Sequence, residues 1–144
     1  MLHKTLLPMA LAAALLALAG CSSPSGSVAA PNPDPAHNSR NAVDWAGTYQ
    51  GVLPCADCPG IRTRLVLQPD GRFELSRQYI DRQAAPLVRT GRIEWNEAGN
   101  TITLVTPGER GPQLRVGEGR LLQLYADGSA PPWSDTRQVL IKTP

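Results

Sequence analysis

The sequence is poor in the residues that most catalytic and metal sites require. It has two histidines, three cysteines and two methionines, and both methionines and one histidine fall among the first nine residues. His37 alone remains beyond that stretch, which excludes a Ser-His-Asp constellation and a closed zinc site with four nitrogen or sulfur ligands. The sequence also lacks a large excess of charge of one sign, since it has 14 basic and 12 acidic residues and no basic run. We therefore expect no enzyme and no nucleic-acid partner.

Long hydrophobic runs are also absent. The N-terminal run, Leu6–Leu18, is about a dozen residues long, whereas a membrane-spanning helix needs ~20. Lys4 precedes it and the sequence LAGC, ending at Cys21, follows it. This layout is typical of a secretory signal peptide, and its end resembles a bacterial lipobox. We expect residues 1–20 to be removed and Cys21 to carry acyl chains (palmitate), with Ser22 favouring the outer membrane over the inner membrane.

The residues that follow the lipobox divide into a tether and one domain. Residues 21–43 are rich in Ser, Pro, Asn and Ala and show no apolar period, which is typical of a flexible linker. Residues 44–144 are about as long as one small domain. We therefore expect a single domain that faces the periplasm or the cell surface from a lipid anchor.

The domain reads as short strands separated by turns, with no sustained helical period. In residues 61–67 the side chains of Ile61, Thr63, Leu65 and Leu67 share one face, which is the period of a half-buried strand. Similar segments cover residues 47–53, 72–80, 87–95, 101–105, 112–117, 120–126 and 137–143, with turns at 69–71, 96–100 and 117–119. About seven or eight such strands predict an all-β fold, a small antiparallel barrel, because closure removes exposed edges.

Two cysteines of the domain, Cys55 and Cys58, lie three residues apart between two prolines. Outside the cytoplasm they could close a disulfide, since a four-residue turn brings its end Cα atoms within ~7 Å. Reduced, the two thiolates could instead hold Cu(I), a soft ion that suits sulfur ligands. Thiol–disulfide catalysis is disfavoured, because the sequence predicts no helix to activate a thiolate. The domain needs no other cofactor.

The segment around these cysteines resembles the N-terminal domain of the NlpE family of envelope lipoproteins. The resemblance covers about residues 45–126. It rests on the glycine-x-tyrosine-x-glycine pattern, the Leu-Pro-Cys-Ala-Asp-Cys-Pro-Gly-Ile run, an aspartate turn and a later tryptophan segment, which here are Gly47, Tyr49, Gly51, Leu53–Ile61, Asp70, Ile93 and Trp95. Larger members carry a second, OB-like domain, and these residues resemble the N-terminal domain only.

The resemblance implies a lipocalin-like β-barrel on an outer-membrane lipoprotein. It also implies a role in copper tolerance, in adhesion to surfaces and in signalling to a two-component sensor kinase that monitors the envelope. Cys55 and Cys58 would then form a redox- or copper-responsive loop. Two other function classes stay open: a lipocalin-like carrier of a small apolar ligand, which requires a cavity, and a lipoprotein that inhibits a hydrolase through a protruding loop.

Overall fold

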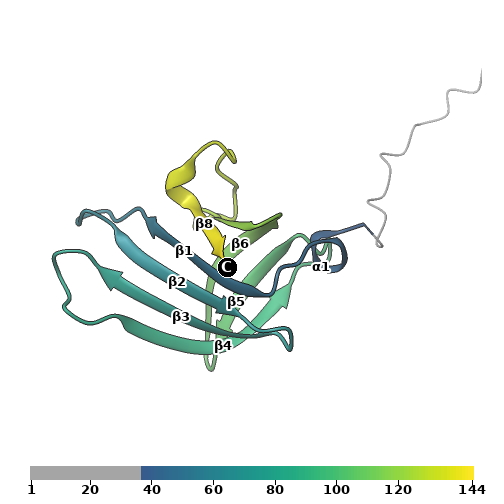
Figure 1. The fold of residues 1–144 in the computed structure, drawn as a ribbon, viewed down its shortest axis with the longest axis horizontal. Helices are drawn as coiled ribbons and strands as arrows, with labels where there is room; N and C mark the ends of the chain where they lie inside the picture. Colours follow the sequence, from purple (N-terminus) through teal and green to yellow (C-terminus); the bar gives the residue numbers. More distant parts are fainter. Residues whose placement is uncertain (1–36) are drawn as a thin grey trace, which may run out of the picture. The chain divides into compact units, whose positions relative to one another are not determined.

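The computed structural model describes residues 37–144, which form a closed barrel of eight antiparallel strands (Figure 1). Each strand pairs with the next along the chain, and the last pairs with the first. The all-β class and the antiparallel barrel predicted from the strand pattern are therefore confirmed. The strands are β1 (Gly47–Leu53), β2 (Ile61–Leu67), β3 (Arg72–Tyr79), β4 (Leu87–Trp95), β5 (Thr101–Thr106), β6 (Glu109–Gly117), β7 (Arg120–Gln123) and β8 (Val139–Thr143).

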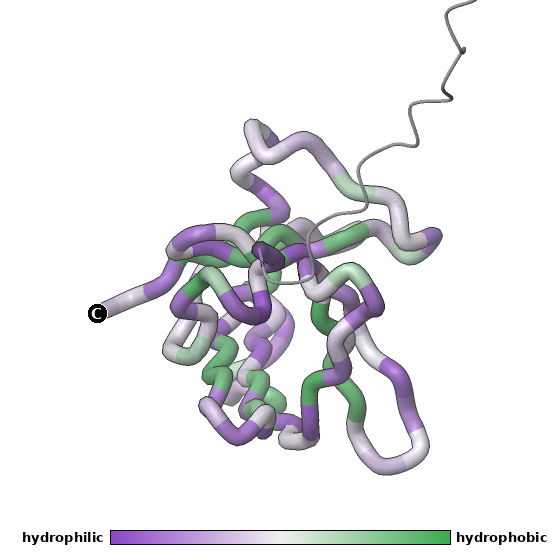
Figure 2. The backbone as a smooth tube through the Cα atoms, turned by 90° about the vertical axis from the view of Figure 1, so that its right-hand side faces the viewer, coloured by the Kyte–Doolittle hydropathy of each residue, from purple (hydrophilic) through white to green (hydrophobic). Residues whose placement is uncertain are grey.

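The alternation of apolar and polar residues decides which side chains fill the barrel. In β2, Thr63, Leu65 and Leu67 are buried while Arg62 and Arg64 are exposed, as the sequence predicts. Figure 2 shows hydrophobic and hydrophilic residues interchanging along the strands of the barrel. The buried core cluster is drawn from seven of the eight strands and comprises Tyr49, Leu53, Leu65, Leu67, Phe73, Leu75, Ile102, Leu104, Leu114, Val116, Leu121 and Leu140.

The barrel closes where the two ends of the domain meet. In this contact Thr48 lies opposite Thr143, and Tyr49 lies opposite Lys142. Tyr49 is fully buried, and its hydroxyl donates a hydrogen bond of 2.8 Å to the Trp45 carbonyl. Burial, together with the charge of Asp44, raises the pKa of the Tyr49 phenol to about 12. The phenol therefore stays neutral and keeps this hydrogen bond over the whole physiological range.

The short turns follow from local chemistry. The Gly71 amide donates to the Gln68 carbonyl, and Gly71 has a φ of 82°, a conformation that glycine adopts without steric cost. The turn after β4 is closed by Asn96, whose side-chain oxygen accepts hydrogen bonds from the amides of Asn100 and Thr101. The turns predicted at residues 69–71 and 96–100 are thus confirmed, and Glu118–Gly119 makes the third, between β6 and β7.

Strand β6 is longer than the sequence pattern predicts. It begins at Glu109 instead of Pro112, and the β5–β6 register shifts between Thr103 and Val105, where Gly111 and Pro112 oppose a single residue. Proline has no backbone N–H, so it is tolerated in a strand at such a bulge. The predicted segment, residues 112–117, began at Pro112 because a proline normally marks a strand boundary.

The predicted segments 120–126 and 137–143 are both shortened at the loop that joins them. Strand β7 ends at Gln123 because the amide of Tyr125 donates to Ser129 and turns the chain. Strand β8 begins at Val139 because Asp135 caps the 3-10 helix η1 (Thr136–Gln138), where its carboxylate accepts from the Arg137 amide. Local capping therefore replaces strand pairing in these residues.

The residues just before β1 belong to the barrel. Helix α1 (Ser39–Ala42) is one turn long, the Arg40 amide donates to the Gly99 carbonyl, and the Ser39 hydroxyl donates to the Val116 carbonyl at 2.9 Å. The sequence analysis placed residues 38–43 in the tether, and the structure ties them to the turn after β4 and to β6. Residues 1–36, which hold the expected signal peptide and most of the tether, lie outside the described residues.

Candidate functional site

The loops of the barrel alternate between its two ends. Loops 54–60 and 80–86, the turn at 107–108 and loop 124–138 lie at one end, which we call the cysteine end. The turns at 68–71, 96–100 and 118–119 and helix α1 lie at the other, which we call the chain-entry end. In Figure 1 the loops after β1 and β3 lie at the left of the domain and helix α1 lies at the right. The loop that carries the cysteines thus lies as far as the barrel allows from the segment that leads toward Cys21.

Cys55 and Cys58 are joined by a disulfide in the loop between β1 and β2. Their Cα atoms are 5.3 Å apart, inside the usual range for a disulfide of ~4.4–6.8 Å. The flanking prolines, Pro54 and Pro59, restrict the backbone on either side. A ring this small restricts the unfolded chain little, so the disulfide adds roughly 2 kcal/mol at most to the free energy of unfolding. The bridge therefore shapes the loop locally more than it stabilises the barrel.

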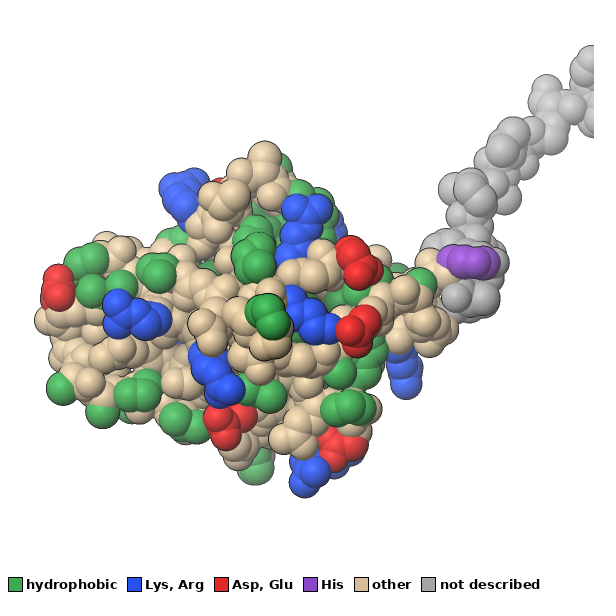
Figure 3. Space-filling view, in the orientation of Figure 1, with side chains coloured by type: hydrophobic (Ala, Val, Ile, Leu, Met, Phe, Trp, Pro, Cys, Tyr) green, Lys and Arg blue, Asp and Glu red, His purple; other side chains and the backbone are tan. Residues whose placement is uncertain are grey.

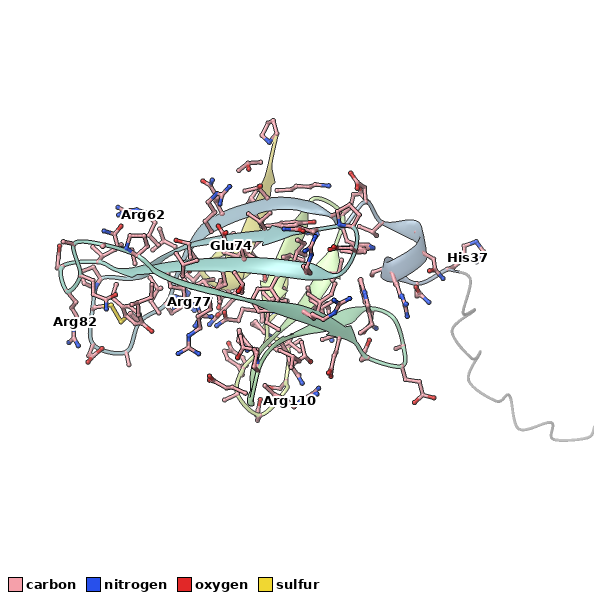
Figure 4. The ribbon with its side chains drawn as sticks, turned by 90° about the horizontal axis from the view of Figure 1, so that it is seen from below. His37, Arg62, Glu74, Arg77, Arg82 and Arg110 are labelled. Atoms are coloured by element: carbon pink, nitrogen blue, oxygen red, sulfur yellow. A yellow bond between two sulfur atoms is a disulfide. The ribbon has the colours of Figure 1, made fainter. Side chains whose placement is uncertain are left out.

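The disulfide loop is tied to the neighbouring β3–β4 loop. Arg82 places its guanidinium 2.9 Å from the Asp57 carboxylate and also donates to the Asp57 carbonyl at 2.7 Å. The Ile80 amide donates to the Gly60 carbonyl at 3.0 Å. Figure 4 shows Arg82 at the same end of the barrel as the sulfur atoms. The ion pair is exposed, so it is worth about 0–1 kcal/mol, and its effect is to couple the position of one loop to the other.

The oxidised loop does not fit a copper ion, because its sulfur atoms are bonded to each other and offer no thiolate. Among residues 37–144, no group of three or more His, Cys, Asp or Glu side chains could hold a metal. After reduction, Cys55 and Cys58 would offer two thiolates, and the Cys55 sulfur lies 3.6 Å from a carboxylate oxygen of Asp57. Within this part of the chain, no helix begins at the loop, so the dipole that activates catalytic cysteines is missing there.

The tryptophans pack mainly toward the chain-entry end. Trp45 and Trp95 contact each other edge to face at 5.6 Å between ring centroids and pack against the core. Trp133 lies beneath the guanidinium of Arg120, 4.5 Å from the ring centroid. They cover the core and hold the loop 124–138 in place, and none of them lines the hollow in the barrel wall beside Phe73 and Leu75.

That hollow, between β3–β4 and β5–β6, is a cavity of about 200 Å³. Phe73, Leu75 and Leu104 contribute apolar walls, while Arg77 and Arg89 bring two positive charges. A carrier of an apolar ligand would require a large apolar pocket, so this cavity departs from that expectation in size and in charge. Arg77 was not recognised in the sequence analysis, although its place in the alternation Phe73, Leu75, Arg77, Tyr79 puts it on the inward face.

The remaining surface carries no one-signed patch on the face shown in Figure 3, where basic and acidic side chains are interspersed. Cys21, the expected site of lipidation, lies outside the described residues. Within residues 37–144, no helix is long and apolar enough to cross a membrane.

Curated relatives align with part of the domain. The chain is 33% identical over 57 residues to lipoprotein NlpE of Escherichia coli (strain K12), which covers 40% of this chain and 24% of that protein. It is 37% identical over 49 residues to the 17 kDa lipoprotein of Treponema pallidum (strain Nichols), covering 34% of this chain and 31% of that protein. The alignments thus span less than a third of each relative's length.

Solved structures extend the likeness to the fold. A putative lipoprotein from Shewanella oneidensis has a TM-score of 0.66 and 38% identity, covering 74% of this chain and 96% of that one. The Cpx pathway activator NlpE from Escherichia coli has a TM-score of 0.52 and 27% identity, covering 60% of this chain and 44% of that one. The family model of the NlpE N-terminal domain matches residues 49–132, more than half of the chain. With strands β2–β7 and the disulfide loop inside the matched region, the chain belongs to the NlpE N-terminal domain family.

Proposed function

We propose that this protein is a lipid-anchored, non-enzymatic sensor of the cell envelope, in which the Cys55–Cys58 loop responds to redox state or copper. The observation that carries the proposal is the position of the disulfide at the cysteine end, opposite the chain-entry end and tied to a second loop. A sensor loop in this place can contact a partner in the periplasm while the other end leads to the anchor. The similarity to an activator of the Cpx pathway supports the periplasmic domain of an envelope-stress sensor kinase as that partner.

The anchor in this proposal is Cys21, acylated after removal of residues 1–20 and held in the outer membrane. Several acyl chains anchor a protein stably, whereas one binds only marginally. The name lipoprotein, printed for two curated relatives, supports this assignment. The test is the mass of the envelope protein: Cys21→Ala should abolish the acyl mass shift and release the protein from the membrane fraction. Retention of that shift would contradict the assignment of Cys21.

The loop would act through its covalent state. Reduction takes two electrons and two protons from a dithiol of the envelope, breaks the S–S bond and leaves two thiols, while the donor becomes a disulfide. Cys55 and Cys58 are then free to move apart, and the contacts with the β3–β4 loop, chiefly those of Arg82 with Asp57, still hold the loop. A partner that contacts both loops would distinguish the two states, and a difference of 1.4 kcal/mol in contact energy changes occupancy tenfold.

In this proposal, copper would bind the loop only after the disulfide is reduced. Two thiolates from Cys55 and Cys58 suit Cu(I), whereas the oxidised pair offers no ligand. Copper tolerance would then depend on the reduced loop, and the metal would hold it in a shape that differs from the disulfide.

The decisive experiment compares Cys55→Ser/Cys58→Ser with Ala56→Ser, which changes the same loop but keeps the disulfide. The double variant should alter the output of an envelope-stress reporter, or survival in copper, at unchanged protein abundance. The control should behave as the wild type. If the double variant is abundant, membrane-bound and indistinguishable from wild type in both assays, the disulfide is purely structural and the proposal fails.

A further inference from the structure

We propose that the cavity at the cysteine end binds a short amphipathic carboxylate, with its charge on Arg77 and its apolar chain on Phe73 and Leu75. This inference is independent of the sensor function of the disulfide loop. It rests on a cavity, an unpartnered cation and an opening in the barrel wall.

Arg77 occupies an inward position of β3 and has no partner. Its Nε atom is buried and makes no hydrogen bond, and no carboxylate of residues 37–144 forms an ion pair with it. The guanidinium has five N–H donors and no acceptor, and charges inside proteins are normally paired. Burial lowers the pKa of Arg77 from its ordinary value. A partly buried cation that lines a cavity, and whose buried Nε atom has no acceptor, indicates that the acceptor comes from a ligand.

The other charged side chains that line the cavity do not compensate the positive charge of Arg77. Arg89, on the next strand, also lines the cavity, but its guanidinium lies 2.7 Å from the carboxylate of Glu109. The charges of Arg89 and Glu109 cancel, so the cavity lining keeps one net positive charge, which is that of Arg77. In Figure 4, Arg77 lies closer to the middle of the barrel than Arg82 does. The cation is thus positioned to select an anion that enters the interior.

The apolar walls require the ligand to have an apolar part. Phe73, Leu75 and Leu104 are each at most 5% exposed and line the cavity beside Arg77. The volume, about 200 Å³, is below the ~300–1,000 Å³ of pockets for drug-sized ligands. The ligand class is therefore a short-chain carboxylate and not a long-chain lipid.

An opening in the barrel wall gives the ligand a way in. Strands β4 and β5 pair only where Arg92–Trp95 faces Ile102–Val105. Beyond that pairing, Leu87–Thr90 forms ladder pairs only with β3 among the described strands. On the opposite side of the gap the bulge at residues 111–112 interrupts the β5–β6 ladder. Bulges are frequent beside binding sites, where they end pairing and redirect side chains.

Arg77 also borders a second, more open hollow with Gln123, whose Oε1 atom is buried without a hydrogen-bond partner. A donor and an acceptor that both lack partners could be bridged by one water molecule. A water-filled interior is thus the rival explanation, and a binding measurement separates it from a carboxylate site.

The test uses residues 21–144 with Cys21→Ala, so that no attached acyl chain competes, and titrates octanoate and 1-octanol. Both probes have the same chain, and only octanoate is charged. Calorimetry should give one saturable octanoate site, with 1-octanol at least tenfold weaker, and the Leu75 and Leu104 methyl resonances should shift with octanoate. Arg77→Met should weaken octanoate at least tenfold and make acid and alcohol equal.

The matched control is Arg64→Met, on the outer face of β2, where Arg64 pairs with Glu74 at 3.6 Å. This variant should bind octanoate as the wild type does. The proposal is overturned if octanoate shows no saturable site, if 1-octanol binds the wild type equally well, or if Arg77→Met leaves the affinity unchanged. A crystal structure grown with octanoate that shows a water between Arg77 and Gln123, and no octanoate, would overturn it as well.

Discussion

Replacing Arg77 by methionine is expected to make the unliganded barrel more stable. The Arg77 side chain is partly buried, and its Nε atom is buried without an acceptor. Methionine has a similar apolar stem, so Arg77→Met keeps packing against the cavity walls while it removes the unpaired group. A side chain that stabilised the unliganded barrel would give the opposite sign on replacement.

The magnitude follows from the cost of a buried polar group without a partner, about 1–3 kcal/mol. Part of the guanidinium reaches solvent, so we expect a gain of about 1–2 kcal/mol. For a domain of this size, 1 kcal/mol shifts Tm by about 4–8 °C. Thermal unfolding followed by circular dichroism should therefore show Tm of Arg77→Met higher by at least about 4 °C. Arg64→Met is the control variant, because the exposed ion pair that it loses is worth only about 0–1 kcal/mol.

Octanoate should offset the stability advantage of Arg77→Met. A ligand that binds only the folded state at 100 times its Kd adds about 2.7 kcal/mol of stability. The wild type should gain this amount, whereas Arg77→Met, with a Kd at least tenfold higher, should gain at most about 1.4 kcal/mol, so that the difference in stability between the two proteins changes by at least about 1.3 kcal/mol in favour of the wild type. A fall in Tm for unliganded Arg77→Met would refute the reasoning, because it would show that Arg77 already has a stabilising partner.

Two further predictions concern the barrel itself. Tyr49→Phe should cost about 1–3 kcal/mol at neutral pH by leaving the Trp45 carbonyl without its donor. The pKa of Tyr49 is about 12 in the folded protein, against 10.0 for the free side chain. The stabilisation by the neutral phenol is therefore complete below pH 10, and roughly 3 kcal/mol of it is lost between pH 10 and 12. Denaturant titrations should show this loss in the wild type and not in Tyr49→Phe. Gly91→Ala should cost about 1–3 kcal/mol, because an added Cβ overlaps the Val105 carbonyl oxygen of β5. Thr90→Ala, at the exposed neighbouring residue, should change Tm little. Equal Tm values for these two variants would contradict the close approach at Gly91.

Two local patterns in the sequence determined much of this protein. The alternation in residues 61–67 and 72–79 needs only the two-residue period of a strand, because successive side chains point to opposite faces. The turn at residues 69–71 and the proximity of Cys55 and Cys58 likewise depend on four or five consecutive residues. Such features are decided by backbone geometry and turn chemistry, so they can be read without knowing what packs against them.

Tertiary structure decided the features that depend on residues far apart in the chain. The pairing of Thr48 with Thr143 closes the barrel across 95 residues, and no local pattern indicates which strands meet. The same closure brings Ser39 onto Val116 and so orders residues that resemble a tether by composition. Arg77 is the clearest case: its inward position could be read from the alternation, but its lack of a partner could not. An unpaired charge is a property of everything that surrounds it, and only the folded barrel brings those surroundings together.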